Sequence, residues 1–294
     1  MPVNSEKTKK RFGNVFFIGL LSFFGGISQD IFVPILPLYL ANVLHLDRAF
    51  IGLSEGLVTS GASIFRIVAG FLSDKFKKRK PIIFAGYFLS LVSRPLLAIL
   101  TGGSWILGLR FLDGVGKGVK DSPKDALIAS STEKTNRGRG FGVARMLDTL
   151  GSVAGPLLLF ALLYLWRDNP LKYHYILLLS PIPLIATLAV LVLKVKEAPV
   201  QEIASGNTAG KGRFPVIFYL FLGVVAVFSI GNSSDAFLIL RAQNLGVTLL
   251  AIPLVYALFN FVYAAASVPL GALSDRIGRE KGTAHRLDRV CACV

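Results

Sequence analysis

The chain has 294 residues, of which 53% are hydrophobic and only 17% are charged. Soluble domains carry about 25% charged residues, and apolar runs of about 20 residues recur along almost the whole chain, so the composition excludes an ordinary water-soluble protein. The net charge of +15 could suit a nucleic-acid ligand. The basic residues fall mainly between the apolar runs, however, so a membrane protein explains the charge and no nucleic-acid partner is expected.

Windows of apolar residues predict eight membrane-spanning helices after a basic cytoplasmic tail at residues 1–13. The first apolar run is far longer than the core of a signal peptide, so we expect it to remain as a span. The N terminus is placed in the cytoplasm by the positive-inside rule, because the loops of the opposite side hold only Arg48, Arg167, Lys172 and Arg241. The predicted spans are residues 14–40, 50–73, 81–101, 104–122, 141–164, 173–193, 215–240 and 249–273.

Span 1 carries Asp30 roughly ten residues, or about 15 Å, below the outer surface. A charged side chain that faces lipid costs about 3 kcal/mol, so such groups are expected to face one another or a wet cavity. We therefore predict a polar pathway in the outer half of the first six spans, lined by Asp30, Glu55, Arg94, Arg110 and Asp113.

Two pairs of charged residues admit a simpler interpretation. Arg110 and Asp113 are i, i+3 neighbours on one helix and could merely neutralise each other. Arg145 and Asp148 have the same spacing at the inner end of span 5 and are expected to form a structural pair.

A basic motif follows span 2, at Gly70, Asp74, Lys75, Lys78 and Arg79. The glycine permits close helix packing, and the basic cluster favours the cytoplasmic side. The same pattern returns after span 8, at Gly271, Asp275 and Arg276. Span 5 carries small residues and a proline that allow close packing and a bend, at Gly142, Gly151, Gly155 and Pro156.

The chain contains an internal repeat around its one long polar linker, residues 194–214. Residues 27–32 of span 1 parallel residues 232–237 of span 7, and the two basic motifs are similarly placed. A six-helix half at 14–193 is thus followed by the start of a second copy at 215–281, as in duplicated transporters.

These motifs resemble those of the major facilitator superfamily. Arg110, Asp113, Gly114 and Gly116 look like its span 4 motif, the span 5 residues look like its exporter signature, and Lys77 stands where the family prefers glycine. The resemblance implies an all-α integral membrane bundle with about eight of the usual twelve spans and alternating access between two halves. It also implies a multi-pass protein of the plasma membrane, in bacteria the inner membrane.

The acidic residue and prolines of span 1 resemble proton-linked drug exporters of that superfamily. We therefore expect proton-coupled export of a small organic solute, with Asp30 as the proton-binding carboxylate and Arg110 as its partner. Asp113, Glu55 and Arg94 would line the pathway. The alternatives are an importer of a metabolite or iron chelate, and a truncated fragment that moves nothing.

The remaining features predict no catalysis. The three histidines are scattered, so no metal site, cofactor or catalytic set is expected. Residues 116–126 lack the spacing of a phosphate-binding loop and are expected at the inner surface between spans 4 and 5. Residues 282–294 contain both cysteines and match nothing in the first repeat, which predicts a non-homologous tail.

Overall fold

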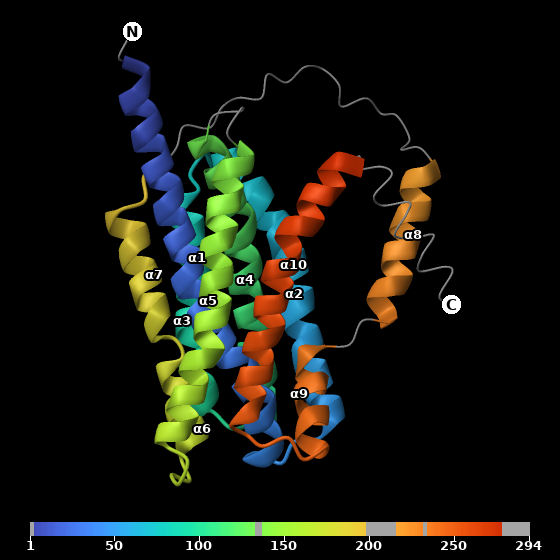
Figure 1. Ribbon diagram of the computed structural model, residues 1–294. Helices are drawn as coiled ribbons and strands as arrows, with labels where there is room; N and C mark the ends of the chain where they lie inside the picture. The colour runs from blue at the N-terminus through green and yellow to red at the C-terminus, as the bar shows by residue number, and fades with distance from the viewer. Residues whose placement is uncertain (1–2, 133–136, 198–215, 232–233, 278–294) are drawn as a thin grey trace.

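The computed structural model describes residues 3–132, 137–197, 216–231 and 234–277 of the chain (Figure 1). In these residues the regular structure is entirely α-helical. The helices are α1 (Val3–Asn42), α2 (Arg48–Phe76), α3 (Lys80–Ile99), α4 (Gly103–Ser131), α5 (Arg137–Leu165), α6 (Lys172–Leu179), α7 (Ile182–Leu193), α8 (Val216–Gly231), α9 (Asp235–Asn244) and α10 (Ala251–Ile277).

The predicted all-α membrane bundle is confirmed. Within the described residues, five helical segments are long and apolar enough to cross a membrane, at Gly13–Asn42, Arg48–Phe76, Lys80–Ile99, Gly140–Leu165 and Lys172–Leu193. Large apolar side chains are exposed on the outside of the bundle, among them Ile67, Phe71 and Leu193. Such a surface would be unfavourable in water and suits lipid.

Local sequence explains where α2 and α3 begin and end. The Asp47 side chain caps α2 by accepting a hydrogen bond from the Phe50 amide at 2.7 Å. Lys77 ends α2 in the left-handed region, with φ 53°, which gives a physical reason for the family preference for glycine at this turn. Pro81 lies in the first turn of α3, where its missing N–H costs no helical hydrogen bond.

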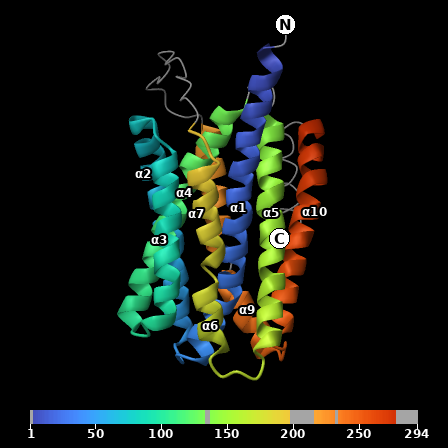
Figure 2. The same cartoon turned by 90° about the vertical axis from the view of Figure 1, so that its left-hand side faces the viewer.

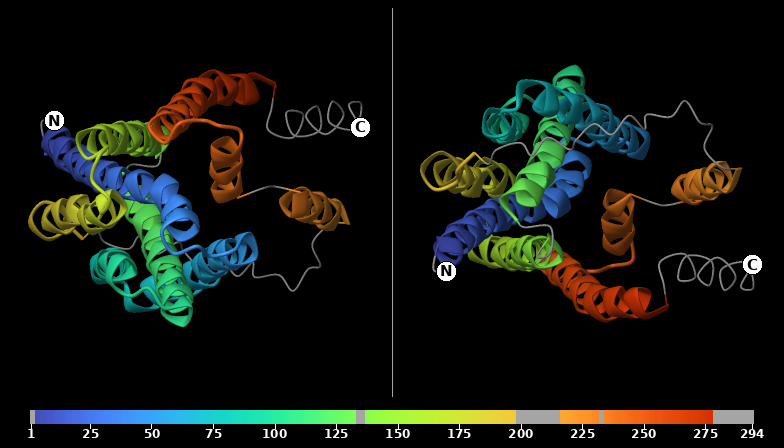
Figure 3. Two further views of the ribbon diagram at one scale, coloured as in Figure 1. Left: turned by 90° about the horizontal axis from the view of Figure 1, so that it is seen from below. Right: turned by 90° about the horizontal axis from the view of Figure 1, so that it is seen from above.

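Helix α1 forms the centre of the bundle. It packs against α4, α5 and α7, and most of its apolar side chains are buried (Figures 2 and 3). Helix α2 packs closely on α4, because a Cβ atom at Gly114 or Gly118 would collide with the carbonyl oxygens of Val58 and Ala62. Helix α10 lies against α5, whereas α8 stands apart from the bundle.

Predicted spans 6 and 7 are each divided into two helices. Helices α6 and α7 are separated at Ser180 and Pro181, as expected where proline removes a helical hydrogen bond. Span 7 is described as α8 and α9 on either side of residues 232–233, and the Ser234 side chain caps α9 by accepting from the Ala236 amide.

The helix of predicted span 4 extends beyond residue 122, the predicted end of the span. Helix α4 continues to Ser131, and Pro123 is accommodated inside it. Residues 117–126 are therefore part of a helix and do not form a loop at the surface. This extension determines the composition of the cavity described below.

Candidate functional site

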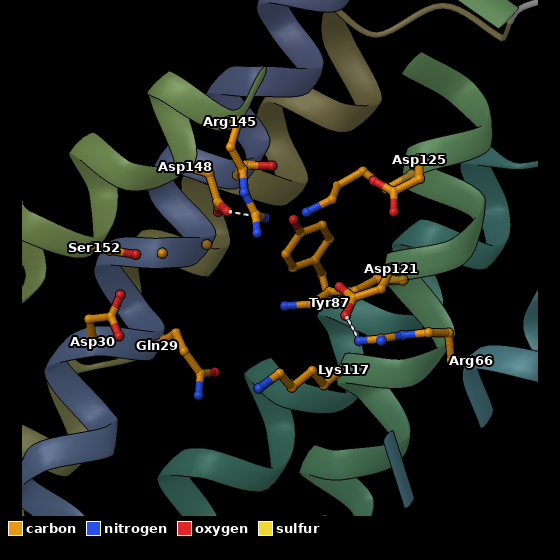
Figure 4. Close-up of a pocket in the computed structure, with 15 residues that line it drawn as sticks. Gln29, Asp30, Arg66, Tyr87, Lys117, Asp121, Asp125, Arg145, Asp148 and Ser152 are labelled. Atoms are coloured by element: carbon orange, nitrogen blue, oxygen red, sulfur yellow. Dashed lines mark hydrogen bonds and ion pairs between the residues drawn. The ribbon is translucent and has the colours of Figure 1, made fainter. Parts of the chain in front are cut away.

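A polar cavity of about 470 Å³ lies between α1, α4 and α5, with contributions from α2 and α3 (Figure 4). Asp30 and Gln29 form the α1 wall, and Ser152 and Asp148 belong to the α5 wall. A second hollow of about 360 Å³ shares Ser22, Lys124, Asp125, Arg145 and Asp148 with it. Arg145 and Asp148 belong to the N-terminal half of α5, so the cavity continues toward the end of the bundle that carries the chain's N terminus.

Asp30 is buried at the α1–α5 contact, with only 8% of its surface exposed. Helix α5 approaches closely there because Gly155 has no side chain: a Cβ atom at Gly155 would lie 3.0 Å from the Asp30 Cβ. Ser152 of α5 lies beside Asp30, and the Ser152 carbonyl oxygen accepts a hydrogen bond from the Asn260 side chain of α10 at 3.0 Å. Asp30 therefore lies where α1, α5 and α10 meet.

A buried ion-pair network lies next to this cavity. Arg94 on α3 is 1% exposed, and its Nε is 3.1 Å from Oδ1 of Asp113 on α4. The same guanidinium donates to Ser28 Oγ at 2.7 Å and to Gln29 Oε1. Gln29 also lines the cavity, so this side chain connects the network with the space beside Asp30.

Arg110 completes the network on its other side. It pairs with Glu55 on α2, and its Nη1 is 3.8 Å from Oδ2 of Asp113. Both arginines of the network lie over the ring of Phe32, with Arg94 at 5.0 Å and Arg110 at 5.6 Å from the ring centroid. Four predicted pathway residues are thus joined across α2, α3 and α4.

The expected partnership of Arg110 with Asp30 is not found in the structure. Arg110 is occupied by Glu55 and Asp113, and Asp30 faces the neighbouring cavity instead. Arg145 and Asp148 do form the expected pair, at 3.3 Å. Sequence periodicity could place these groups within the spans but could not assign partners across helices.

The cavity also contains charged residues that sequence analysis had placed in a surface segment. They lie on α4 at Lys117, Lys120, Asp121, Lys124 and Asp125. Their spacing of three and four residues was a usable signal, because it puts them on one helical face. The prediction that residues 116–126 lie at the inner surface concealed it.

The basic motif after α2 connects three parts of the fold through one residue. Arg79 is buried, and its guanidinium donates to the Ala126 carbonyl oxygen at 2.9 Å and to Ser130 Oγ at 2.6 Å. The backbone amides of Arg79 and Lys80 both donate to the Glu197 carboxylate, at 2.9 and 3.0 Å. This motif thus fixes the start of α3 to the end of α4 and to the residues after α7.

The other motif residues are less constrained. Gly70 lies close to Ser122 of α4, whereas Asp74, Lys75 and Lys78 are exposed. In the second copy, residues 271, 275 and 276 belong to α10, but their side chains, like residues 278–294, are outside the described part of the chain. In span 5, Gly151 and Gly155 contact α1, Gly142 has open space around it, and Pro156 is inside α5.

We expect Arg94→Met to destabilise the protein by about 3 kcal/mol, because it leaves the buried Asp113 carboxylate without its nearest partner. Thermal unfolding in one detergent would measure the loss. The double variant Arg94→Met/Asp113→Leu should recover part of it. Arg145→Met is the control: Arg145 is 75% exposed, so its pair should contribute less than about 1 kcal/mol. If Arg94→Met and Arg145→Met lose the same amount of stability, the buried network does not contribute as proposed.

Comparison with known proteins identifies similar sequences over almost the whole chain. The family model of the Major Facilitator Superfamily matches residues 18–284. The "Uncharacterized MFS-type transporter MJ1317" of Methanocaldococcus jannaschii is 34% identical over 287 residues, covering 94% of this chain and 70% of that protein. The "Multi-drug resistance efflux pump PmrA" of Streptococcus pneumoniae is 24% identical over 270 residues, covering 88% of this chain and 66% of the pump.

The fold also resembles solved transporters. A bacterial homolog of the human lysosomal transporter Spinster, in an inward-facing and unoccupied conformation, matches with a TM-score of 0.70 and 16% identity. The match covers 92% of this chain and 64% of that one. Another relative is the "Uncharacterized protein Rv2265" of Mycobacterium tuberculosis. It is 30% identical over 238 residues, which cover 78% of this chain and 57% of that protein. The chain thus spans between about half and two thirds of the length of most of these proteins.

Proposed function

The chain belongs to the major facilitator superfamily, and from this premise we propose that it acts as a secondary active transporter that exports small organic solutes in exchange for protons. The observation that carries the proposal is the polar cavity with the buried Asp30 carboxylate on its wall. A carboxylate buried at this depth is costly unless it serves a polar pathway. The similarity to an efflux pump supports export as the direction.

In this proposal Asp30 takes up and releases the coupling proton. The charged groups that surround it are Lys117 of α4, Asp148 of α5 and Arg94 of α3. Motion of α4 or α5 relative to α1 would change these distances and hence the affinity of the carboxylate for a proton. These three helices belong to the first half, so their rearrangement would accompany the rocking of the two halves by which alternating access operates.

The network of Arg94, Asp113, Arg110 and Glu55 would act as a rigid support for this site. It holds α2, α3 and α4 together, and through Gln29 it positions the turn of α1 that carries Asp30. The motif at Arg79 would constrain the cytoplasmic ends of α3 and α4. We assign these residues to positioning and the proton exchange to Asp30.

The proposed organisation follows the internal repeat. Residues 14–193 would form the first six-helix half, residues 194–214 the cytoplasmic linker, and residues 215–281 the start of the second half. With the N terminus in the cytoplasm, the cavity would open to the cytoplasm, where an exporter collects its substrate. The proposed location is the plasma membrane, which in bacteria is the inner membrane.

Dye accumulation in everted membrane vesicles tests this function. Vesicles with the expressed chain would be acidified inside and supplied with either carboxyfluorescein or rhodamine 123, two dyes of related ring structure and opposite charge. Gradient-dependent accumulation of either dye, above that in vesicles without the chain, is the expected result. Accumulation only in right-side-out vesicles would indicate import, and accumulation in neither orientation would overturn the transport proposal.

A further inference from the structure

Three lysines form one wall of the cavity. Lys117, Lys120 and Lys124 follow one another on α4 at spacings of three and four residues, which places them on the same helical face. Lys117 extends toward the side of the cavity formed by Gln29 and Asp30 (Figure 4). Lys120 is only 8% exposed, and its ammonium group lies 4.5 Å from the centroid of the Tyr87 ring on α3.

The other charges of the cavity lie near these lysines but, among the described residues, form no direct ion pair with them. Asp121 is held by Arg66 of α2 at 2.7 Å, and Asp148 is held by Arg145 of α5 at 3.3 Å. Among the residues that the structure describes, no carboxylate forms an ion pair with any of the three lysines. The two remaining carboxylates of the cavity are Asp30, which belongs to α1 on the opposite wall, and Asp125, which is exposed.

An ammonium group that is nine-tenths buried without a carboxylate at ion-pair distance is expensive. The ring of Tyr87 recovers only part of that cost. A negatively charged ligand between the α1 and α4 walls would supply a direct ion-pair partner for three neighbouring lysines at once. The volume of about 470 Å³ is in the range of small-molecule sites.

We propose that the cavity binds a small organic anion, whose carboxylate or phosphate group lies against Lys117, Lys120 and Lys124. This assignment rests on the proposed transport function and names its substrate class. Lysines act as compact point charges without a fixed fork geometry, so either type of acidic group would be accepted. Because the cytoplasm is electrically negative, the membrane potential favours the exit of an anion, by about 2.3 kcal/mol per charge and 100 mV.

Dye binding to the purified chain in detergent tests the charge preference without requiring transport. Fluorescence polarisation should show tighter binding of carboxyfluorescein than of rhodamine 123. Lys117→Gln and Lys124→Gln should each weaken carboxyfluorescein binding by about tenfold, the effect of one charged contact. Lys117→Arg keeps the charge and should retain most of the affinity, which separates loss of charge from loss of fold.

Lys172→Gln is the matched control, since this lysine begins α6, at the end of the bundle opposite the chain's N terminus, and donates to the Arg167 carbonyl oxygen at 3.0 Å. It removes one positive charge and should leave binding unchanged. Unlabelled benzoate and phenyl phosphate distinguish the two acidic groups as competitors, and displacement by either supports the proposal. Displacement by benzylamine to the same extent would overturn it.

Two further results would overturn the anion site: tighter binding of rhodamine 123, or carboxyfluorescein binding that Lys117→Gln and Lys124→Gln do not change. Failure of the anion site can be distinguished from failure of the transport proposal. Gradient-driven accumulation of rhodamine 123 alone would support transport and reject the anion site. Lysine-dependent carboxyfluorescein binding without accumulation in either vesicle orientation would support the site and reject transport.

Discussion

Replacement of Asp30 with asparagine is expected to abolish the dependence of transport on a pH gradient while leaving the fold intact. Asparagine has nearly the same shape but cannot exchange a proton at neutral pH. The side chain lies at the meeting point of α1, α5 and α10, so the amide can occupy the same space beside Ser152 and Gly155. The measurement is dye accumulation in everted vesicles with and without an imposed gradient.

Asp168→Asn is the matched control for this experiment. Asp168 is 89% exposed in the connection between α5 and α6, and its only described ion pair is with the neighbouring Arg167. The control should keep full coupling, and Asp30→Asn should fall to the level seen without a gradient. If Asp30→Asn keeps its gradient dependence, Asp30 is not the coupling group.

Hydropathy predicted the positions of the helices well because the bilayer imposes a strong and simple constraint. A helix that crosses lipid must be about 20 residues long and largely apolar, so charges and prolines mark its ends. Span 3, predicted at 81–101, is found as Lys80–Ile99. The same rule failed at α4, because its second half faces a polar cavity and bundle interior, and there charged residues do not mark a helix end.

The charged residues of the buried network could be predicted to associate, but their pairing and the lysines of the cavity could not. Buried charges in lipid have few acceptable surroundings, so Arg94, Arg110, Asp113 and Glu55 could be expected to associate. Which carboxylate meets which arginine depends on helix rotation and crossing, which one sequence does not determine. Arg110 therefore contacts Glu55 and Asp113 in the structure. The cavity beside Asp30 is lined instead by the lysines of α4.

The internal repeat illustrates the same limit. Residues around Asp30 and Asp235 are alike in sequence, yet Asp30 is buried in the continuous helix α1, whereas Asp235 is exposed in the first turn of α9 after the Ser234 cap. Ser234 is a favoured helix-capping residue, whereas the first copy has Gln29 at the corresponding position, and a helix begins at this place only in the second copy. Similar motifs thus take different local structure where the capping residue differs.

Gly151→Ala is expected to destabilise the protein by about 1–3 kcal/mol, because the added methyl group would collide with the carbonyl oxygen of Phe23 on α1. The backbone of α1 cannot move aside without disturbing its buried contacts. Gly142→Ala is the control within the same helix and the same motif: no atom lies within 4 Å of the added carbon, and alanine is the better helix former by about 1 kcal/mol.

Thermal unfolding of the two variants in one detergent should therefore shift in opposite directions. Gly151→Ala should also reduce transport, since the next residue, Ser152, and Gly155 one turn further along lie against Asp30. Equal effects of the two substitutions would mean that the glycines of this motif act only through helix propensity. A loss confined to Gly151 would instead assign the motif to the α1–α5 contact, and would connect a pattern of small residues with the geometry of the proposed proton site.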